Sequence, residues 1–260
     1  MKIFINTDNK NSNSLKTKEE LIKISQELKM EITNEISECD LIISIGGDGT
    51  FLKSARLSCE KPLIGIHTGT LGFLTEVDPK NIRQALNEIL NENYHIEERM
   101  MLEGEIIRKD GETERIPEAL NEIGISKNII GVMRFDVLVN EKIINSYTAN
   151  GILVCTPTGS TAYNLSCGGP IVDPTAQILT LTPIAPHTVI NRSIVLSDDS
   201  IVKIKITELR DNTTSFVLYD DLPIEVFNED AVIIRKSDKI TKIIKLENRS
   251  FIDTIRENIN

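Results

Sequence analysis

The stretch Leu41 to Leu52, LIISIGGDGTFL, decides how the first part of the chain folds. Its first five residues, 41–45, form an unbroken apolar run, which is typical of a strand buried on both faces of a parallel sheet. Beyond the glycines, the spacing of Phe51, Leu52 and Ala55 fits a helix better than a strand. The stretch therefore predicts a strand, a glycine-rich turn and a helix in succession.

The turn from Gly46 to Thr50 combines three glycines with one acid. Glycine lets the backbone approach a ligand closely, and the free amides at the start of a helix favour phosphate. Asp48 would repel a bare phosphate, so it suits a turn that meets Mg²⁺ or a hydroxyl that must lose a proton. The alternative is a turn selected for geometry, with Asp48 as the helix N-cap. The spacing matches neither the P-loop nor the GxGxxG dinucleotide fingerprint.

Residues 1–93 predict an α/β N-terminal domain with a parallel, Rossmann-like sheet. A buried strand over 2–6 is followed by a helix that a capping box at Thr17 and Glu20 would start. A second strand–loop unit covers 63–72, and Asp78 with Pro79 begins another helix. In such open sheets ligands lie beyond the carboxyl ends of the strands, where the glycine loops 46–50 and 69–72 both fall.

Residues 94–246 predict a β-rich, sandwich-like C-terminal domain. Short apolar runs recur between turn signals, and Asp110-Gly111 and Asn140-Glu141 each separate two such runs, as in a β-hairpin. A short helix is predicted over 250–257, and the tail 247–260 is a candidate to pack back on the first domain.

Composition excludes several classes of function. The 260 residues carry 29 Lys and Arg against 39 Asp and Glu, a formal charge of −10, without any basic run. We therefore expect no nucleic-acid partner. No apolar run approaches the ~18 residues of a membrane span, and the first residues lack the apolar core of a secretion signal, so we expect a cytoplasmic protein without a membrane partner.

The cysteines and histidines show no metal-site spacing. Four cysteines contain no CxxC pair and the three histidines lie far apart, so the sequence predicts neither a zinc site nor a disulfide framework. The four cysteines, which we expect as reduced thiols, are Cys39, Cys59, Cys155 and Cys167.

Two stretches interrupt the β pattern of the second half. In LNEIGIS, residues 120–126, Asn121 and Glu122 start an apolar run; they suit hydrogen bonding to a ribose or base, or simply mark an exposed strand end. In TPTGSTAYNLSCGGP, residues 156–170, a short helix beginning near Thr161 would offer amides to a phosphate or carboxamide. The alternative is a surface turn.

Taken in order, GGDGT, HTGTLGFL, LNE and TPTGSTAYNLSCGGP resemble the NAD kinase family over most of the chain, from about Ile3 to about Arg235. Turns like GGDGT also occur in diacylglycerol and sphingosine kinases, and a variant occurs in phosphofructokinases. The TPTGSTAY block is what distinguishes NAD kinases from them.

The resemblance implies phosphoryl transfer from ATP, bound with Mg²⁺ or another divalent cation, to the adenosine 2′-hydroxyl of NAD. It implies Asp48 as catalytic acid–base residue and a homodimer or homotetramer. The nucleotide contacts that it implies lie at Gly47, Asp48, Gly49, Lys53, Phe73, Asn121, Glu122, Asn150, Thr161, Ala162, Tyr163 and Ser166.

The chain departs from the family pattern at three places. Asn150 stands where family members usually carry Asp, and Leu222, after Asp220-Asp221, stands in place of a Gln. His67 replaces a frequent Asn, although His also occurs in the family. The departures at Asn150 and Leu222 keep open the alternative that the chain is a dinucleotide-binding sensor without catalytic activity. A lipid kinase sharing the GGDGT turn would expose an apolar face, for which the sequence shows no candidate.

Overall fold

The computed structural model describes residues 1–57, 61–127, 131–187, 191–209, 214–246 and 250–258. The chain forms two compact units, one of residues 1–99 with 240–260 and the other of residues 100–239. Both divisions fall inside continuous strands, β5 (His95–Ile107) and β16 (Ala231–Lys245). The expected boundaries, after residue 93 and after residue 246, differ from this division, because residues 94–99 and 240–246 belong to the first unit. The expected domain boundaries stay a prediction.

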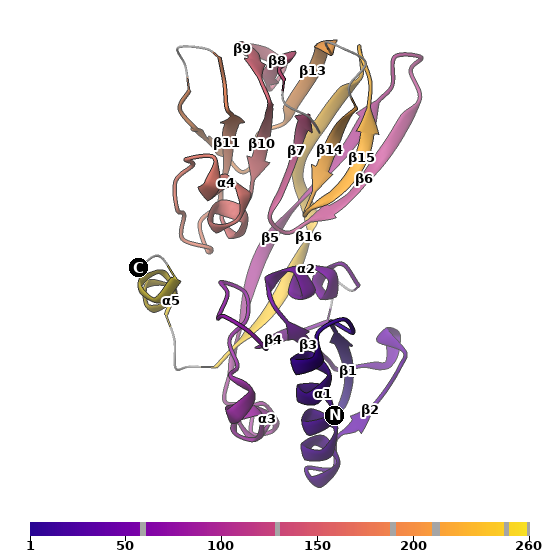
Figure 1. Cartoon of the computed structure of the whole chain (residues 1–260), viewed down its shortest axis with the longest axis vertical. Coiled ribbons are helices and arrows are strands. Elements are labelled where there is room, and N and C mark those ends of the chain that lie inside the picture. Colours follow the sequence, from indigo (N-terminus) through magenta and orange to yellow (C-terminus); the bar gives the residue numbers. More distant parts are fainter. Residues whose placement is uncertain (58–60, 128–130, 188–190, 210–213, 247–249, 259–260) are drawn as a thin grey trace. The chain divides into compact units, whose positions relative to one another are not determined.

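The first unit is built on parallel strands in the order β2 (Glu31–Ile32), β1 (Lys2–Thr7), β3 (Leu41–Gly46) and β4 (Leu63–His67), as Figure 1 shows. The end of β16 adds to β4 through Ile243 and Leu63. All six residues of β3 are buried, which confirms the interpretation of the apolar run as a strand covered on both faces. The parallel α/β fold predicted for this part of the chain is confirmed.

Helices follow the strands of this unit: α1 (Ser12–Glu27), α2 (Asp48–Leu57), α3 (Ile82–Leu90) and, after β16, α5 (Phe251–Asn258). Short 3-10 turns lie at η1 (Ile36–Glu38) and η2 (Pro79–Asn81). Asp78 caps η2, since its side chain accepts the Lys80 amide, and Pro79 follows at the first position as predicted.

The capping box predicted at Thr17 is wrong. α1 begins six residues earlier, because Asn11 is its N-cap and accepts the amides of Asn13 and Ser14. Thr17 is buried within the helix instead. Several N-cap residue types stand in this polar stretch, and local sequence alone does not rank them.

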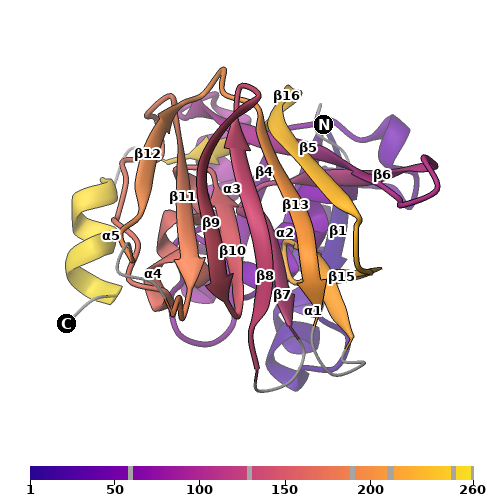
Figure 2. The same cartoon turned by 90° about the horizontal axis from the view of Figure 1, so that it is seen from above.

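The second unit contains two layers of strands. One has the order β16, β13 (Val202–Leu209), β8 (Met133–Val139), β9 (Lys142–Ala149), with β5 and β6 (Thr113–Ala119) on the other side of β16 (Figure 2). The other has the order β12 (Ile194–Ser197), β11 (Ile178–Ile184), β10 (Gly151–Cys155), β7 (Glu122–Lys127), β14 (Ser215–Tyr219), β15 (Leu222–Val226).

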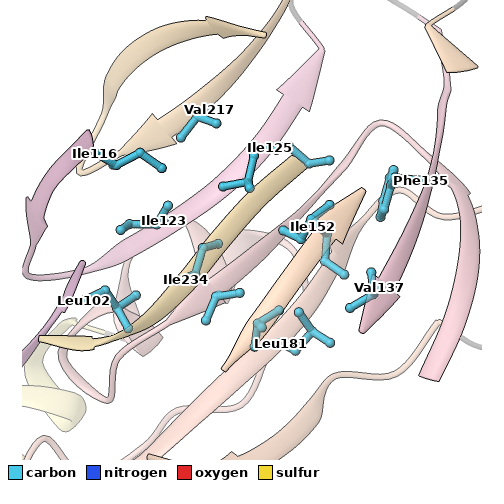
Figure 3. Packing of buried hydrophobic residues seen from close by; sticks show 14 of the residues in the cluster. Leu102, Ile116, Ile123, Ile125, Phe135, Val137, Ile152, Leu181, Val217 and Ile234 are labelled. Carbon is cyan, nitrogen blue, oxygen red and sulfur yellow. The ribbon is translucent and has the colours of Figure 1, made fainter. Parts of the chain in front are cut away.

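Apolar side chains of both sheets meet in a single core. Ile125 and Ile152 of one sheet lie in the same buried cluster as Phe135, Val137 and Ile234 of the other (Figure 3). The sandwich-like, β-rich architecture predicted for this part of the chain is therefore confirmed.

The hairpin predictions are also confirmed. β5 pairs with β6 across Asp110-Gly111, where Gly111 has φ of +91°. β8 pairs with β9 across Asn140 and Glu141, whose φ angles of +49° and +63° are those of a two-residue type I′ turn. Asp220 and Asp221 form a third turn with two positive φ angles, between β14 and β15.

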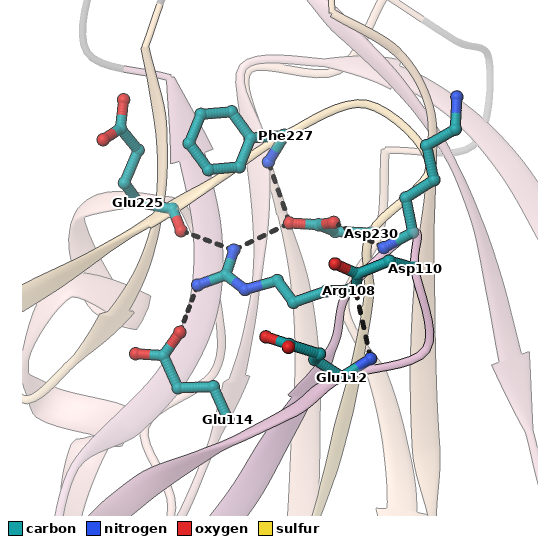
Figure 4. A network of polar contacts seen from close by, with 8 residues as sticks. Arg108, Asp110, Glu112, Glu114, Glu225, Phe227 and Asp230 are labelled. Carbon is teal, nitrogen blue, oxygen red and sulfur yellow. Dashed lines mark hydrogen bonds and ion pairs between the residues drawn. The ribbon is translucent and has the colours of Figure 1, made fainter.

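Arg108, at the end of β5, ties the β5–β6 hairpin to the turn before β16 (Figure 4). Its Nη1 donates to Asp230 Oδ2 at 2.8 Å and to the Glu225 carbonyl at 2.9 Å, while Nη2 pairs with Glu114. Its guanidinium carbon lies 5.8 Å from the centre of the Phe227 ring. Asp230 is buried, so this ion pair holds the strand ends rather than a ligand.

Cys39, Cys155 and Cys167 are free thiols, whereas Cys59 lies outside the described residues. Within the described part of the chain, no helix is both long and apolar enough to cross a membrane.

Candidate active site

The glycine loops of the first unit open at one edge of the parallel sheet. β3 and β4 are neighbours with Gly46 opposite His67, so the loops that follow them leave the sheet side by side. A side chain at Gly46, with φ of +155°, would collide with Thr50, whereas a Cβ at Gly47 or Gly49 would meet nothing within 4 Å. The backbone at these two glycines is therefore open to a ligand.

Asp48 joins the two loops. Its Oδ2 accepts the Phe73 amide at 2.9 Å, and its Oδ1 accepts the Leu74 amide at 3.1 Å. Asp48 is the first residue of α2, and these bonds run to the other loop, so the alternative interpretation of Asp48 as the N-cap of its own helix is wrong. Gly72 is part of the same arrangement, since a Cβ there would lie 2.1 Å from Asp48 Oδ1.

The other candidates of the first unit lie around this pair of loops. Lys53 is exposed on α2, and Phe73 is half-buried. The helix itself is anchored by a chain of bonds in which Asn6 Nδ2 donates to Ser54 Oγ at 2.8 Å and Ser54 Oγ donates to the Thr50 carbonyl at 2.9 Å. His67 ends β4, and its Nδ1 lies 3.2 Å from the Gly69 carbonyl.

In the second unit, Asn121 and Glu122 are buried, each with 7% of its surface exposed. The alternative of an exposed strand end is therefore wrong. Glu122 starts β7 in the middle of its sheet and stands opposite Cys155 of β10.

Glu122 is an acid in an unfavourable place for a charge. Burial, followed by the charges of Asp220 and Asp221, raises the pKa of Glu122 from its ordinary 4.5 to about 8. Its Oε2 is buried without a hydrogen-bond partner among the described residues. Near neutral pH the carboxyl is therefore mostly protonated, so it can both donate and accept a hydrogen bond.

The first part of the stretch 156–170 is packed, since residues 156–160 are all buried, so the surface-turn alternative is wrong. It forms the 3-10 turn η3 (Thr158–Thr161) and the short helix α4 (Tyr163–Ser166), which confirms the predicted helix. Asn164 is fully buried and donates to the carbonyls of Ser160 and Pro170, both at 3.0 Å. Thr182 in turn donates to Asn164 Oδ1 at 2.7 Å.

The predicted contact residues of this stretch have free surface. Thr161 and Ala162 are half-buried, whereas Tyr163 and Ser166 are exposed. Partial burial of the Tyr163 side chain raises its pKa, with smaller contributions from Cys167 and Glu122. Tyr163 and Glu122 therefore share one electrostatic environment.

Asn150 does not join this group. Glu122 stands opposite Cys155 at one end of β10, whereas Asn150 precedes Gly151 at the other end, five residues or about 17 Å along the strand. Its backbone is bound there, with the Asn150 amide donating to Ile184 and the Lys127 amide donating to the Asn150 carbonyl. The second unit thus brings together Asn121, Glu122 and the 156–166 segment, but not Asn150.

Comparison with known proteins decides the family. The model of the ATP-NAD kinase N-terminal domain matches residues 2–94, and that of the ATP-NAD kinase C-terminal domain matches residues 118–246. An NAD kinase of Caldanaerobacter subterraneus subsp. tengcongensis is 39% identical over 242 residues, or 91% of this chain and 84% of the relative. The chain belongs to the NAD kinase family.

Further relatives agree with this assignment. NAD kinases of Thermoanaerobacter pseudethanolicus and Lachnospira eligens are 38% and 37% identical, covering 87% and 85% of this chain and 81% and 79% of theirs. The chain is therefore an enzyme, a kinase of NADP biosynthesis, and neither the lipid-kinase nor the sensor interpretation is retained.

Solved NAD kinase family structures share the fold. Yeast NADH kinase complexed with NADH matches with a TM-score of 0.86 at 24% identity, over 99% of this chain and 86% of that one. An NAD kinase from Archaeoglobus fulgidus in complex with ATP matches with a TM-score of 0.80 at 24% identity, over 98% and 97%.

Proposed function

We propose that this enzyme transfers the terminal phosphoryl group of ATP to the 2′-hydroxyl of the adenosine ribose of NAD, giving NADP and ADP. Membership of the NAD kinase family supports the overall reaction. The observation that carries the mechanism is the carboxylate of Asp48, which two backbone amides hold at the ligand-binding edge of a parallel sheet.

The first unit supplies the chemistry in this proposal. Phosphoryl transfer depends on positioning and charge neutralisation more than on covalent chemistry. Asp48 takes the proton of the ribose hydroxyl late in the transfer, or it orients the metal ion. The open backbone at Gly47 and Gly49 approaches the phosphates, exposed Lys53 adds a positive charge, and Phe73 lies near the adenine.

The second unit supplies recognition of NAD. Asn121 and Glu122 bind the adenosine ribose, for which a buried and mostly protonated Glu122 is suited as both donor and acceptor. The residues proposed to contact the rest of NAD are Thr161, Ala162, Tyr163, Ser166 and Asn150. Asn150, distant from Glu122 along β10, is assigned to the nicotinamide end of the dinucleotide.

Mg²⁺ enters this proposal with ATP. Within the described residues, no three His, Cys, Asp or Glu side chains gather to form a metal cage. The single carboxylate of Asp48 fits Mg²⁺, which proteins commonly bind through one or two carboxylates together with substrate phosphates. Asp48 would orient the ion, which would supply neutralisation of the charge that develops on the phosphates.

The experiment that tests the function is NADP formation by the purified protein. NAD and Mg²⁺ are supplied with ATP in one reaction and with polyphosphate in another. We expect NADP and an equal amount of ADP in the reaction with ATP. Absence of NADP in the reaction with ATP would overturn the proposed function, whichever result polyphosphate gives.

Asp48→Asn tests the role of the carboxylate. Because removal of a general base typically costs ~10² to 10⁴ in rate, we expect a folded variant that binds NAD and turns over at least about 10²-fold more slowly. Asp78→Asn is the matched control, since Asp78 also accepts a backbone amide in the first unit but lies outside the glycine loops. Turnover of Asp48→Asn at the wild-type rate would remove Asp48 from the mechanism.

We also propose that the enzyme is a homodimer or homotetramer and acts in the cytoplasm. The family resemblance supports the assembly, and the free thiols of Cys39, Cys155 and Cys167 support a reducing compartment. Analytical ultracentrifugation measures the assembly, and a sedimenting monomer at micromolar concentration would contradict it.

A further inference from the structure

The chain bends sharply at Leu120 and Asn121. β6 ends at Ala119 in one sheet of the second unit and β7 begins at Glu122 in the other, so these two residues make the whole crossover between sheets. Residues in such a bend have no strand partners for their amides and carbonyls, and buried backbone groups must be satisfied elsewhere. Both residues are buried.

Two residues from distant parts of the chain satisfy all four backbone groups of the bend. Asp220 Oδ2 accepts the Leu120 amide at 2.9 Å, and Asp220 Oδ1 accepts the Asn121 amide at 2.7 Å. Thr156 Oγ1 donates to the Leu120 carbonyl at 2.6 Å, and the Thr156 amide donates to the Asn121 carbonyl at 2.9 Å. We refer to Thr156 and Asp220 as the clamp.

The clamp extends to both parts of the proposed NAD site. The Asp220 amide donates to the Glu122 carbonyl at 3.1 Å, which fixes the start of β7. Thr156 Oγ1 accepts the Gly159 amide at 3.1 Å, which fixes the turn η3. The turn then lies directly on the bend, because a Cβ at Gly159 would be 2.1 Å from the Asn121 carbonyl oxygen.

The clamp is buried and rigidly mounted. Thr156 is fully buried and Asp220 is 1% exposed. Asp220 stands in the tight β14–β15 turn with φ of +45°, so the turn itself directs its carboxylate at the bend. A buried carboxylate bound by two amides and a buried hydroxyl that both donates and accepts are costly to disturb.

We propose that Asp220 and Thr156 are positioning residues for NAD binding, which hold Asn121, Glu122 and the 158–161 turn in one preformed arrangement. The inference rests on the proposed function, in which these residues contact NAD. Neither clamp residue touches the nucleotide. Each acts through the backbone that it binds, and the site needs no ordering when NAD arrives.

Matched variants test the clamp. Thr156→Val keeps the shape and loses the hydroxyl, whereas Thr156→Ser keeps the hydroxyl. Asp220→Asn replaces one acceptor with a donor, so that one of the two amides loses its bond. Asp221→Asn is the control for charge. It removes the exposed charge of Asp221, which contributes to the raised pKa of Glu122, but it removes no hydrogen bond to the bend.

The measured quantities are the dissociation constant for NAD, by isothermal titration calorimetry, and the melting temperature. We expect Thr156→Val and Asp220→Asn to weaken NAD binding about 10-fold or more, since one lost buried hydrogen bond is worth about a factor of ten. Thr156→Ser and Asp221→Asn should stay within about 3-fold of wild type. At saturating NAD, kcat of the two controls, Thr156→Ser and Asp221→Asn, should stay within about 3-fold of wild type.

A lower melting temperature with an unchanged dissociation constant would reduce the clamp to a structural role and overturn the inference. Hydrogen–deuterium exchange on the wild-type protein tests it even if the variants do not fold. The peptide around 118–124 should be protected without NAD and gain less than about 3-fold on binding, whereas protection that appears only with NAD would overturn the inference. Failure to form NADP would contradict the proposed function. The exchange result would still test the clamp independently, because it measures NAD binding and not turnover.

Discussion

At the scale of single residues, Glu122 makes stability depend on pH. Its pKa is about 8 in the folded chain against an ordinary 4.5, because it is buried beside Asp220 and Asp221. Between these values the folded state holds a proton that the unfolded state has released, so stability is full below pH 4.5 and is lost as pH rises through 8. We expect Glu122→Gln, which cannot ionise, to escape this loss.

Urea unfolding of wild type and Glu122→Gln at pH 5 and pH 8.5 measures the effect. The difference in unfolding free energy should change by on the order of 3 to 5 kcal/mol in favour of the variant at the higher pH. Glu27→Gln is a control that should show almost no change between these pH values, because hydrogen bonding to Arg83 lowers the pKa of the exposed Glu27, which is then ionised in both the folded and the unfolded state above pH 5. A pH-independent difference for Glu122→Gln would show that Glu122 is ionised in the folded chain.

Gly72 is the second residue-scale case, because its lack of a side chain leaves room for the Asp48 carboxylate. Gly72→Ala should displace that carboxylate from the amides of Phe73 and Leu74 and cost about 1 to 3 kcal/mol of stability. Gly69→Ala, in the same loop, places its methyl group where nothing lies within 4 Å and should change stability by less than about 0.5 kcal/mol. Equal losses in thermal unfolding would contradict the close approach.

At the scale of elements, the tight hairpins store strain in non-glycine residues. Glu141 has φ of +63° in the β8–β9 turn, where type I′ geometry favours glycine. We expect Glu141→Gly to raise the unfolding free energy by about 0.5 to 1 kcal/mol, since relief of the left-handed strain exceeds the entropy cost of glycine. Glu35→Gly, at φ of −103°, should give no gain, and a gain of similar size there would refute the explanation.

At the scale of the whole molecule, binding of NAD should stabilise the fold. One site filled at about 100 times its dissociation constant adds about 2.7 kcal/mol, which corresponds to roughly 5 to 10 °C in melting temperature for a chain of this length. Asp48→Asn should show the same shift, because the proposal retains NAD binding in that variant. Nicotinamide mononucleotide, which lacks the adenosine ribose, should give a much smaller shift, and an equal shift would place recognition elsewhere.

Local features of the fold follow from residues near one another in the chain. The apolar run 41–45 and the helical spacing after Gly49 predict β3, its turn and α2, and dipeptides such as Asp110-Gly111 predict hairpins. These succeed because strand and helix periods and turn conformations depend on a few neighbouring residues. The sequence motifs, from GGDGT to TPTGSTAY, are also sufficient to identify the NAD kinase family. Where several local signals compete, as for Asn11 and Thr17 at the start of α1, the sequence does not choose between them.

The partners of the site residues depend instead on how distant segments pack. Asp48 is bound by amides 25 and 26 residues away, and the Asn121 bend by an aspartate 99 residues away. No local period encodes such pairs, because sheet order and strand register determine them. The same packing buries Glu122 and sets its pKa, and it leaves Asn150 at the far end of β10. The sequence alone therefore identified which residues belong to the candidate site. Their burial, protonation and neighbours depend on the tertiary structure.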